Sequence, residues 1–225
     1  MDYAAFLHQQ TAAIVEQYFA NRNVAWIGVP DTGWLTRRQT MDGGHVVALP
    51  GFPAIDAMIW RDDKDRAELW VRPEEKAVDG SDLYEHAWRQ FVRLAANVEA
   101  VTMLAGRKLA IDHLYPETAG KRLGLALVRV MAVNLRSNSL VGSTTEKAAA
   151  GPKPGTLRPR FADSFTLAKV SGFQMSFARR NDSASIARAL WAHLRAQGYP
   201  VAEGAIGELD ADLTASKLDW FRDDL

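Results

Sequence analysis

The chain has 225 residues, of which 48% are hydrophobic and 24% are charged, and its basic and acidic side chains are equal in number. It contains no cysteine and only five histidines, which excludes disulfides, thiolate zinc sites and a cysteine nucleophile, and leaves any metal site to depend mainly on oxygen ligands. No run approaches the roughly 18 apolar residues of a membrane span, and the start, MDYAAFLHQQ, lacks the features of a signal peptide. We therefore expect a single α+β domain over residues 1–225, located in the cytoplasm and without a membrane partner.

The first hundred residues predict a helix, several strands and a second helix. Asp2 is placed to cap a helix that runs to about Ala20. The expected strands are VAWIGV from Val24, HVVAL from His45, AIDAMIW from Ala54 and RAELWV from Arg66. The last two strands should form a hairpin, because RDDKD between them favours a turn. Ser81 is then expected to cap a long helix with a broad apolar stripe that continues to about Leu104.

The second half alternates apolar runs with short polar segments. After Gly106, the runs LAIDHLY and LALVRVMAV flank the helix-like segment PETAGKRLG, which predicts a strand, an excursion, a strand and then a turn or helix. The proline-rich segment GPKPGTLRPRF, from Gly151, should be largely irregular. Asp182 is expected to cap another helix that ends before Gly198 and Pro200.

An acidic tail is expected at about residues 205–225, with a short amphipathic helix from about Leu209 to Leu225. Its large apolar side chains, Leu218, Trp220 and Phe221, are too bulky to be left exposed without a reason. The tail is therefore expected to pack on its own domain, on a protein partner or on a second copy of the chain.

Charge is distributed unevenly along the chain. Residues 105–200 contain 15 Lys and Arg but only 5 Asp and Glu, whereas the residues after Pro200 contain 2 basic and 7 acidic residues. A basic block of this kind favours nucleic acid as a partner, with phosphate contacts expected from Lys147, Lys153, Arg158 and Arg160. The alternative is that folding mixes these charges into an ordinary surface, with the four side chains simply solvated.

One cluster of residues has the composition of a hydrolytic site for phosphodiesters. Asp112 and His113 end the first apolar run, Asn134 and Asn138 follow the second run, and Glu146 comes eight positions later. Such a site needs a hard divalent cation held by oxygen ligands, a base that activates water and a group that orients the base. Adjacent strand residues point to opposite faces, so Asp112 and His113 are expected to converge only where the pleat is broken.

The segment IDHLYP resembles the start of the HNH, or ββα-metal, nuclease element, in which an Asp-His pair ends the first strand. The resemblance spans about forty residues, within about 105–150, and implies an endonuclease (a hydrolase) that depends on Mg²⁺ or Mn²⁺. It implies that Asp112 binds the metal with help from Asn138 or Glu146. It also implies that His113 is the general base and that Asn134 or Asn138 orients its ring.

The sequence departs from the family in two ways. No histidine follows on the expected helix, and the cysteine pairs that brace many relatives are missing. The main alternative is a non-catalytic nucleic-acid-binding or protein-binding subunit, in which Asp112 and His113 form only a local hydrogen bond. A weaker alternative is a restriction-type set of Asp56, Glu68 and Lys76, although Trp70 stands where the lysine should follow Glu68.

Overall fold

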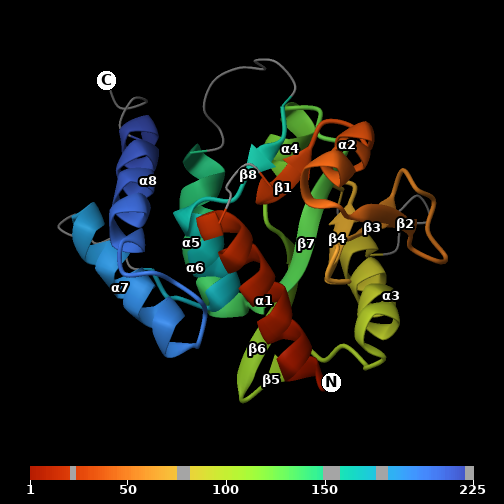
Figure 1. Ribbon diagram of the computed structural model, residues 1–225, viewed down its shortest axis with the longest axis horizontal. Helices are drawn as coiled ribbons and strands as arrows, with labels where there is room; N and C mark the ends of the chain where they lie inside the picture. Colours follow the sequence, from red (N-terminus) through yellow and green to blue (C-terminus); the bar gives the residue numbers. More distant parts are fainter. Residues whose placement is uncertain (21–23, 75–81, 149–157, 176–181, 221–225) are drawn as a thin grey trace.

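The computed structural model describes residues 1–20, 24–74, 82–148, 158–175 and 182–220, without the side chains of residues 142–148 and 216–220. The described residues form an α+β fold (Figure 1). The helices are α1 (Tyr3–Ala20), α2 (Gly33–Asp42), α3 (Leu83–Ala96), α4 (Glu117–Arg122), α5 (Leu135–Ala148), α6 (Ser164–Ser171), α7 (Ser183–Ala196) and α8 (Ala205–Trp220). The strands are β1 (Trp26–Val29), β2 (His45–Ala48), β3 (Ala57–Arg61), β4 (Ala67–Val71), β5 (Met103–Leu104), β6 (Arg107–His113), β7 (Leu127–Asn134) and β8 (Arg160–Phe161).

Strand β7 is the centre of an antiparallel sheet with the order β2-β3-β4-β7-β1-β8. One edge of β7 pairs with β4. The other edge pairs first with β1, where Val128 lies opposite Gly28, and then with β6, where Asn134 lies opposite Leu109. The predicted β3–β4 hairpin is confirmed, and so is the predicted order of strand, short helix and strand for β6, α4 and β7.

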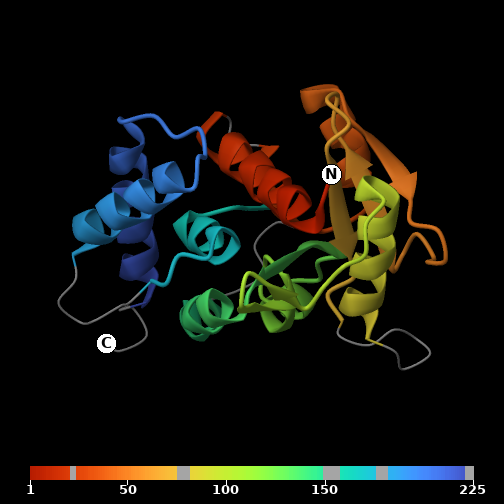
Figure 2. The ribbon, with the colours of Figure 1, turned by 90° about the horizontal axis from the view of Figure 1, so that it is seen from below.

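Both faces of the sheet are covered, which explains why β4 and β7 read as nearly continuous apolar runs. The larger core lies against α1, α3 and α5 to α8 and takes Ile59, Leu69 and Val130 from the sheet. The smaller core lies against α2 and takes Trp60 and Trp70 from the sheet. In Figure 1 and Figure 2, α7 and α8 form a pair at one end of the molecule, and α3 lies at the opposite end.

The boundaries of α3 correct one expectation. Its N-cap is Asp82, whose side chain accepts a hydrogen bond from the backbone N–H of Glu85, and Ser81 lies outside the described residues. The helix ends at Ala96 and does not continue to Leu104, because Asn97 takes the left-handed conformation (φ 55°) that closes a helix. Residues 103–104 instead form β5, which turns into β6 through Ala105 and Gly106, both with positive φ.

Two helices were not predicted. Helix α2 buries only Leu35 and Arg38, so its sequence has no apolar periodicity to reveal it. Helix α6 begins with a capping box in which Asp163 and Thr166 satisfy each other's backbone N–H groups. The predicted α7 is confirmed, with Asp182 as its N-cap, while the last helix begins at Ala205 and thus before Leu209.

Within the described ranges, no helix is both long enough and apolar enough to cross a bilayer. The predicted docking residues of the tail lie beyond what the structure describes: Leu218 and Trp220 belong to the part of α8 without described side chains, and Phe221 follows it.

Candidate functional site

Asp112 and His113 lie together at the end of β6. The Asp112 Oδ1 atom accepts a hydrogen bond from the His113 backbone N–H at 2.8 Å and also lies 2.8 Å from the His113 Nδ1 atom. The strand keeps its register through both residues, with Asp112 opposite Met131 and His113 opposite Val130. No break in the pleat is therefore needed, because the short Asp112 side chain bends back onto its neighbour's backbone.

A lysine from a different helix completes this cluster. The Lys169 Nζ atom, on α6, lies 3.1 Å from Asp112 Oδ2 and donates a hydrogen bond to the His113 carbonyl oxygen at 2.5 Å. Lys169 is only 7% exposed. Its own carbonyl oxygen accepts a hydrogen bond from Ser137 Oγ at 3.2 Å, which joins α6 to α5 beside the sheet.

The charge state of the cluster follows from these contacts. Burial disfavours the charged form of Asp112, but the His113 contact and the Lys169 ammonium outweigh it and lower the pKa of the carboxyl below its usual range. Asp112 is therefore an ionised carboxylate at neutral pH. Both of its oxygens already have partners.

The arrangement does not fit a resident divalent ion. The Lys169 ammonium already lies 3.1 Å from Asp112 Oδ2 and would compete with a divalent cation for that oxygen. Across the part of the chain that the structure describes, no group of three or more His, Asp or Glu side chains is placed to hold a metal. The side chain of Glu146, a predicted ligand on α5, lies outside the described residues.

Asn134 lies apart from Asp112 and His113. Asn134 lies opposite Leu109, which is three residues before Asp112 on β6 and hence about 10 Å along the strand. Its Oδ1 atom caps α5 by accepting hydrogen bonds from the backbone N–H groups of Arg136 (3.0 Å) and Ser137 (3.2 Å). Asn138 is half-buried on α5, and no hydrogen bond among described residues connects it to Asp112 or His113.

Two of the four predicted phosphate contacts, Arg158 and Arg160, lie among the described residues, at β8. Lys153 and the side chain of Lys147 fall outside the described residues, while Arg158 is exposed just before β8. Arg160 on β8 lies over the ring of Tyr115 at 6.0 Å and pairs through β1 with the beginning of β7. That point is six residues from Asn134, or about 20 Å along the strand.

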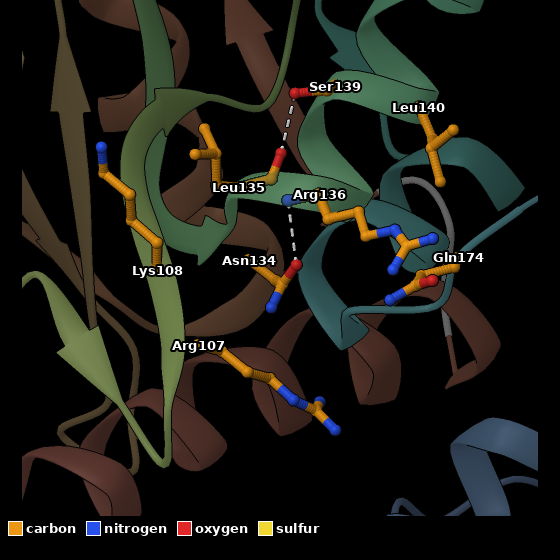
Figure 3. Close-up of a pocket in the computed structure, with 8 residues that line it drawn as sticks. All are labelled: Arg107, Lys108, Asn134, Leu135, Arg136, Ser139, Leu140 and Gln174. Carbon is orange, nitrogen blue, oxygen red and sulfur yellow. Dashed lines mark hydrogen bonds between the residues drawn. The ribbon is translucent and has the colours of Figure 1, made fainter.

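A pocket of about 590 Å³ lies at the Asn134 end of β7, between β6, the start of α5 and the segment after α6. It is lined by Arg107, Lys108, Asn134, Leu135, Arg136, Ser139, Leu140 and Gln174. Figure 3 shows the side chains of Arg107 and Arg136 on the same side of β6, with Asn134 between them and Gln174 beside Arg136. Lys108 leaves the opposite side of the strand.

The three basic side chains of this pocket have no acidic partner among the described residues. Among the described residues, no ion pair involves Arg107, Lys108 or Arg136, and all three side chains are exposed. They belong to the basic block of residues 105–200, but sequence reasoning did not select them. The signal available was their position, because Arg107 and Lys108 follow the turn into β6 and Arg136 follows the end of its partner strand.

The two described residues of the restriction-type set, Asp56 and Glu68, are each paired with arginine. Glu68 on β4 is fully buried between two arginines: Arg38 Nη1 donates to its Oε2 at 2.6 Å, and Arg129 Nη1 lies 3.3 Å from its Oε1. Asp56 pairs with Arg72 at 3.1 Å, and Lys76 lies outside the described residues. Glu68 therefore belongs to an ion network in the smaller core.

No family model, curated protein or solved structure matches the chain. The resemblance to the HNH element thus depends on its own residues alone.

Proposed function

We propose that this protein binds nucleic acid in the cytoplasm through the basic pocket formed by Arg107, Lys108 and Arg136. The observation that carries the proposal is a pocket of about 590 Å³ that Arg107, Lys108 and Arg136 line without acidic partners in the described structure, with the Arg107 and Arg136 side chains on the same side of β6. Ligand pockets commonly have volumes of about 300–1,000 Å³. Unpaired basic side chains attract phosphate groups. When they bind nucleic acid, counterions that were condensed on its phosphates are released.

The position of the pocket adds to this support. It lies at the N-terminal end of α5, where the helix dipole favours negative charge. Asn134 already satisfies two of the free backbone N–H groups there, so the attraction comes mainly from the side chains. Binding of this kind needs no sequence specificity, because phosphate contacts position a protein without reading bases.

Removing the two guanidinium groups tests the proposal. We expect the double substitution Arg107→Gln and Arg136→Gln to weaken binding of single-stranded DNA or RNA by about tenfold. The slope of log affinity against log salt should fall by about 1.4 to 1.8, because each lost phosphate contact removes about 0.7 to 0.9. Fluorescence anisotropy with a labelled oligonucleotide over a series of salt concentrations measures both quantities.

The matched control is the double substitution Arg89→Gln and Arg93→Gln on α3, which removes the same charge from exposed arginines paired with Glu85 and Glu99. An equal loss of affinity in both variants would show a general charge effect and would exclude the pocket as the binding site. Binding of the wild type to anionic vesicles but not to nucleic acid would also contradict the proposal.

A metal-dependent nuclease is the second candidate, and one observation favours it. The order β6, α4, β7 and α5 reproduces two strands followed by a helix, and it keeps Asp112 and His113 in contact at the end of the first strand. In this candidate a divalent ion competes with Lys169 for the Asp112 carboxylate.

Lys169 therefore decides whether Asp112 can be a metal ligand. If it can, Lys169→Met should raise Mn²⁺ affinity at least tenfold, since a competing cation has been removed, and a further Asp112→Asn change should abolish the gain. Lys169→Arg keeps the charge and serves as the control. Isothermal titration of the folded variants measures the affinity, and an unchanged affinity in Lys169→Met would count against the nuclease.

A further inference from the structure

Arg107, Arg136 and Asn134 offer hydrogen-bond donors to the pocket. The Oδ1 atom of Asn134 is used in capping α5, so the amide turns its Nδ2 donor toward the space beside Arg107 (Figure 3). The guanidinium groups of Arg107 and Arg136 have donors only. A ligand group that sits among these three side chains must therefore be rich in acceptors, as a phosphate is.

The same pocket has apolar walls. Leu135 and Leu140 both line it and are each 37% exposed; Leu140 lies on the side of Arg136 and Gln174, and Leu135 lies on the side of Lys108 (Figure 3). A site that bound only the backbone phosphates of a duplex would need cations but no apolar surface. Exposed leucines beside arginines suit a ligand with both a phosphate and a flat, weakly polar ring, because a guanidinium plane also stacks on bases.

We propose that the pocket holds one unstacked nucleotide of a single strand. This inference rests on the proposed nucleic-acid binding and adds the form of the ligand. The phosphate lies among Arg107, Arg136 and the Nδ2 atom of Asn134, and the base lies against Leu140. In a duplex each base stays within its stack and cannot enter a pocket, so the protein should prefer single strands.

Asn134→Asp provides a test that leaves the helix cap in place. Aspartate caps a helix about as well as asparagine, so α5 should keep its N-terminus. The change replaces the Nδ2 donor with an anionic oxygen, which repels phosphate. We expect the affinity for a single-stranded oligothymidylate to fall at least tenfold, with a melting temperature close to that of the wild type.

Leu140→Ser tests the apolar wall without changing charge, and Leu94→Ser, at a leucine on α3 that is 44% exposed, is its matched control. We expect the first change to weaken binding of the single strand severalfold and the second to have no effect. Competition with thymidine 5′-monophosphate, thymidine and inorganic phosphate separates the parts of the ligand, and the monophosphate should compete best.

The results distinguish this inference from the proposed function. Equal wild-type affinity for single-stranded and duplex DNA, together with unchanged binding in Asn134→Asp and Leu140→Ser, would overturn the nucleotide pocket. If the Arg107 and Arg136 double variant nevertheless bound nucleic acid more weakly than the wild type, the proposal that the two arginines bind nucleic acid would still stand. Absence of wild-type binding to any nucleic acid would overturn both.

Discussion

Replacing Glu68 by glutamine is expected to lower the free energy of unfolding by about 3–5 kcal/mol, because breaking a fully buried ion pair leaves a charge without compensation. Glu68 accepts hydrogen bonds from Arg38, from Gln17 at 2.7 Å and from Trp70 at 3.2 Å, and it lies beside Arg129. Glutamine keeps the size of the side chain, so the effect reports charge and hydrogen bonding without creating a cavity. Urea unfolding monitored by tryptophan fluorescence measures it.

The control for this change is Glu85→Gln. Glu85 forms an exposed pair with Arg89 on α3, and exposed pairs contribute less than about 1 kcal/mol. Similar losses in the two variants would show that the buried network contributes no more than a surface pair. The contrast is expected to be large, because Arg129 is also fully buried and its pKa is lowered to about 10 by burial, despite the attraction of Glu68.

Acid should remove the same stabilisation. Burial raises the pKa of Glu68, but Arg129 and Arg38 outweigh it and lower the value from 4.5 to about 2 in the folded protein. A carboxyl with a depressed folded pKa contributes stability that is fully present above its unfolded pKa and is lost as pH falls toward the folded value. The stability gap between wild type and Glu68→Gln should therefore narrow between about pH 4.5 and pH 2.

For the nuclease candidate, His113→Ala is expected to reduce cleavage of plasmid DNA or RNA by about a hundredfold or more, because a general base contributes about 10²- to 10⁴-fold. The Asp112 Oδ1 atom lies 2.8 Å from His113 Nδ1, so the carboxylate is next to the imidazole that would act as the base. Cleavage by the wild type should need Mg²⁺ or Mn²⁺ and stop when a chelator is added. Gel assays with the metal varied measure the rate.

The control is His45→Ala, since His45 is exposed on the edge strand β2 and far along the sheet from β6. The loss of cleavage in His113→Ala reports on catalysis only if the variant keeps a melting temperature close to the wild-type value. A clearly lower melting temperature would show that the change acts on stability. If the wild type cuts no nucleic acid with any divalent ion, the nuclease candidate is abandoned and the binding proposal stands by itself.

Local sequence patterns predicted much of the fold, and the parts that they missed depend on distant partners. Apolar runs and turn residues located six of the eight described strands, and Asp182 marked the start of α7. Helix α2 escaped because the side chain that fixes it is a buried arginine, Arg38, whose partner Glu68 lies thirty residues later. No periodicity within a helix can report such a pair.

The candidate site shows the same limit. The contact of Asp112 with His113 is a local one and follows from their adjacency, so the sequence could indicate it. Lys169, which occupies the other oxygen of Asp112, comes from a helix 57 residues later. The sequence gives no sign of this contact, and it changes the chemistry that Asp112 can perform. Arg136 and Arg107 likewise line the same pocket only because β6 and β7 pair.

The central place of β7 in the sheet has a consequence for how the protein folds. Strands β1 and β4 each pair with β7, which follows them by about 100 and 60 residues in the chain. During synthesis, the edges of β1 and β4 that pair with β7 therefore stay without this partner until residues 127–130 have left the ribosome. Sheets closed by such distant pairings fold slowly, and their open edges can pair with other chains. The nascent chain should therefore need protection from aggregation until β7 is complete.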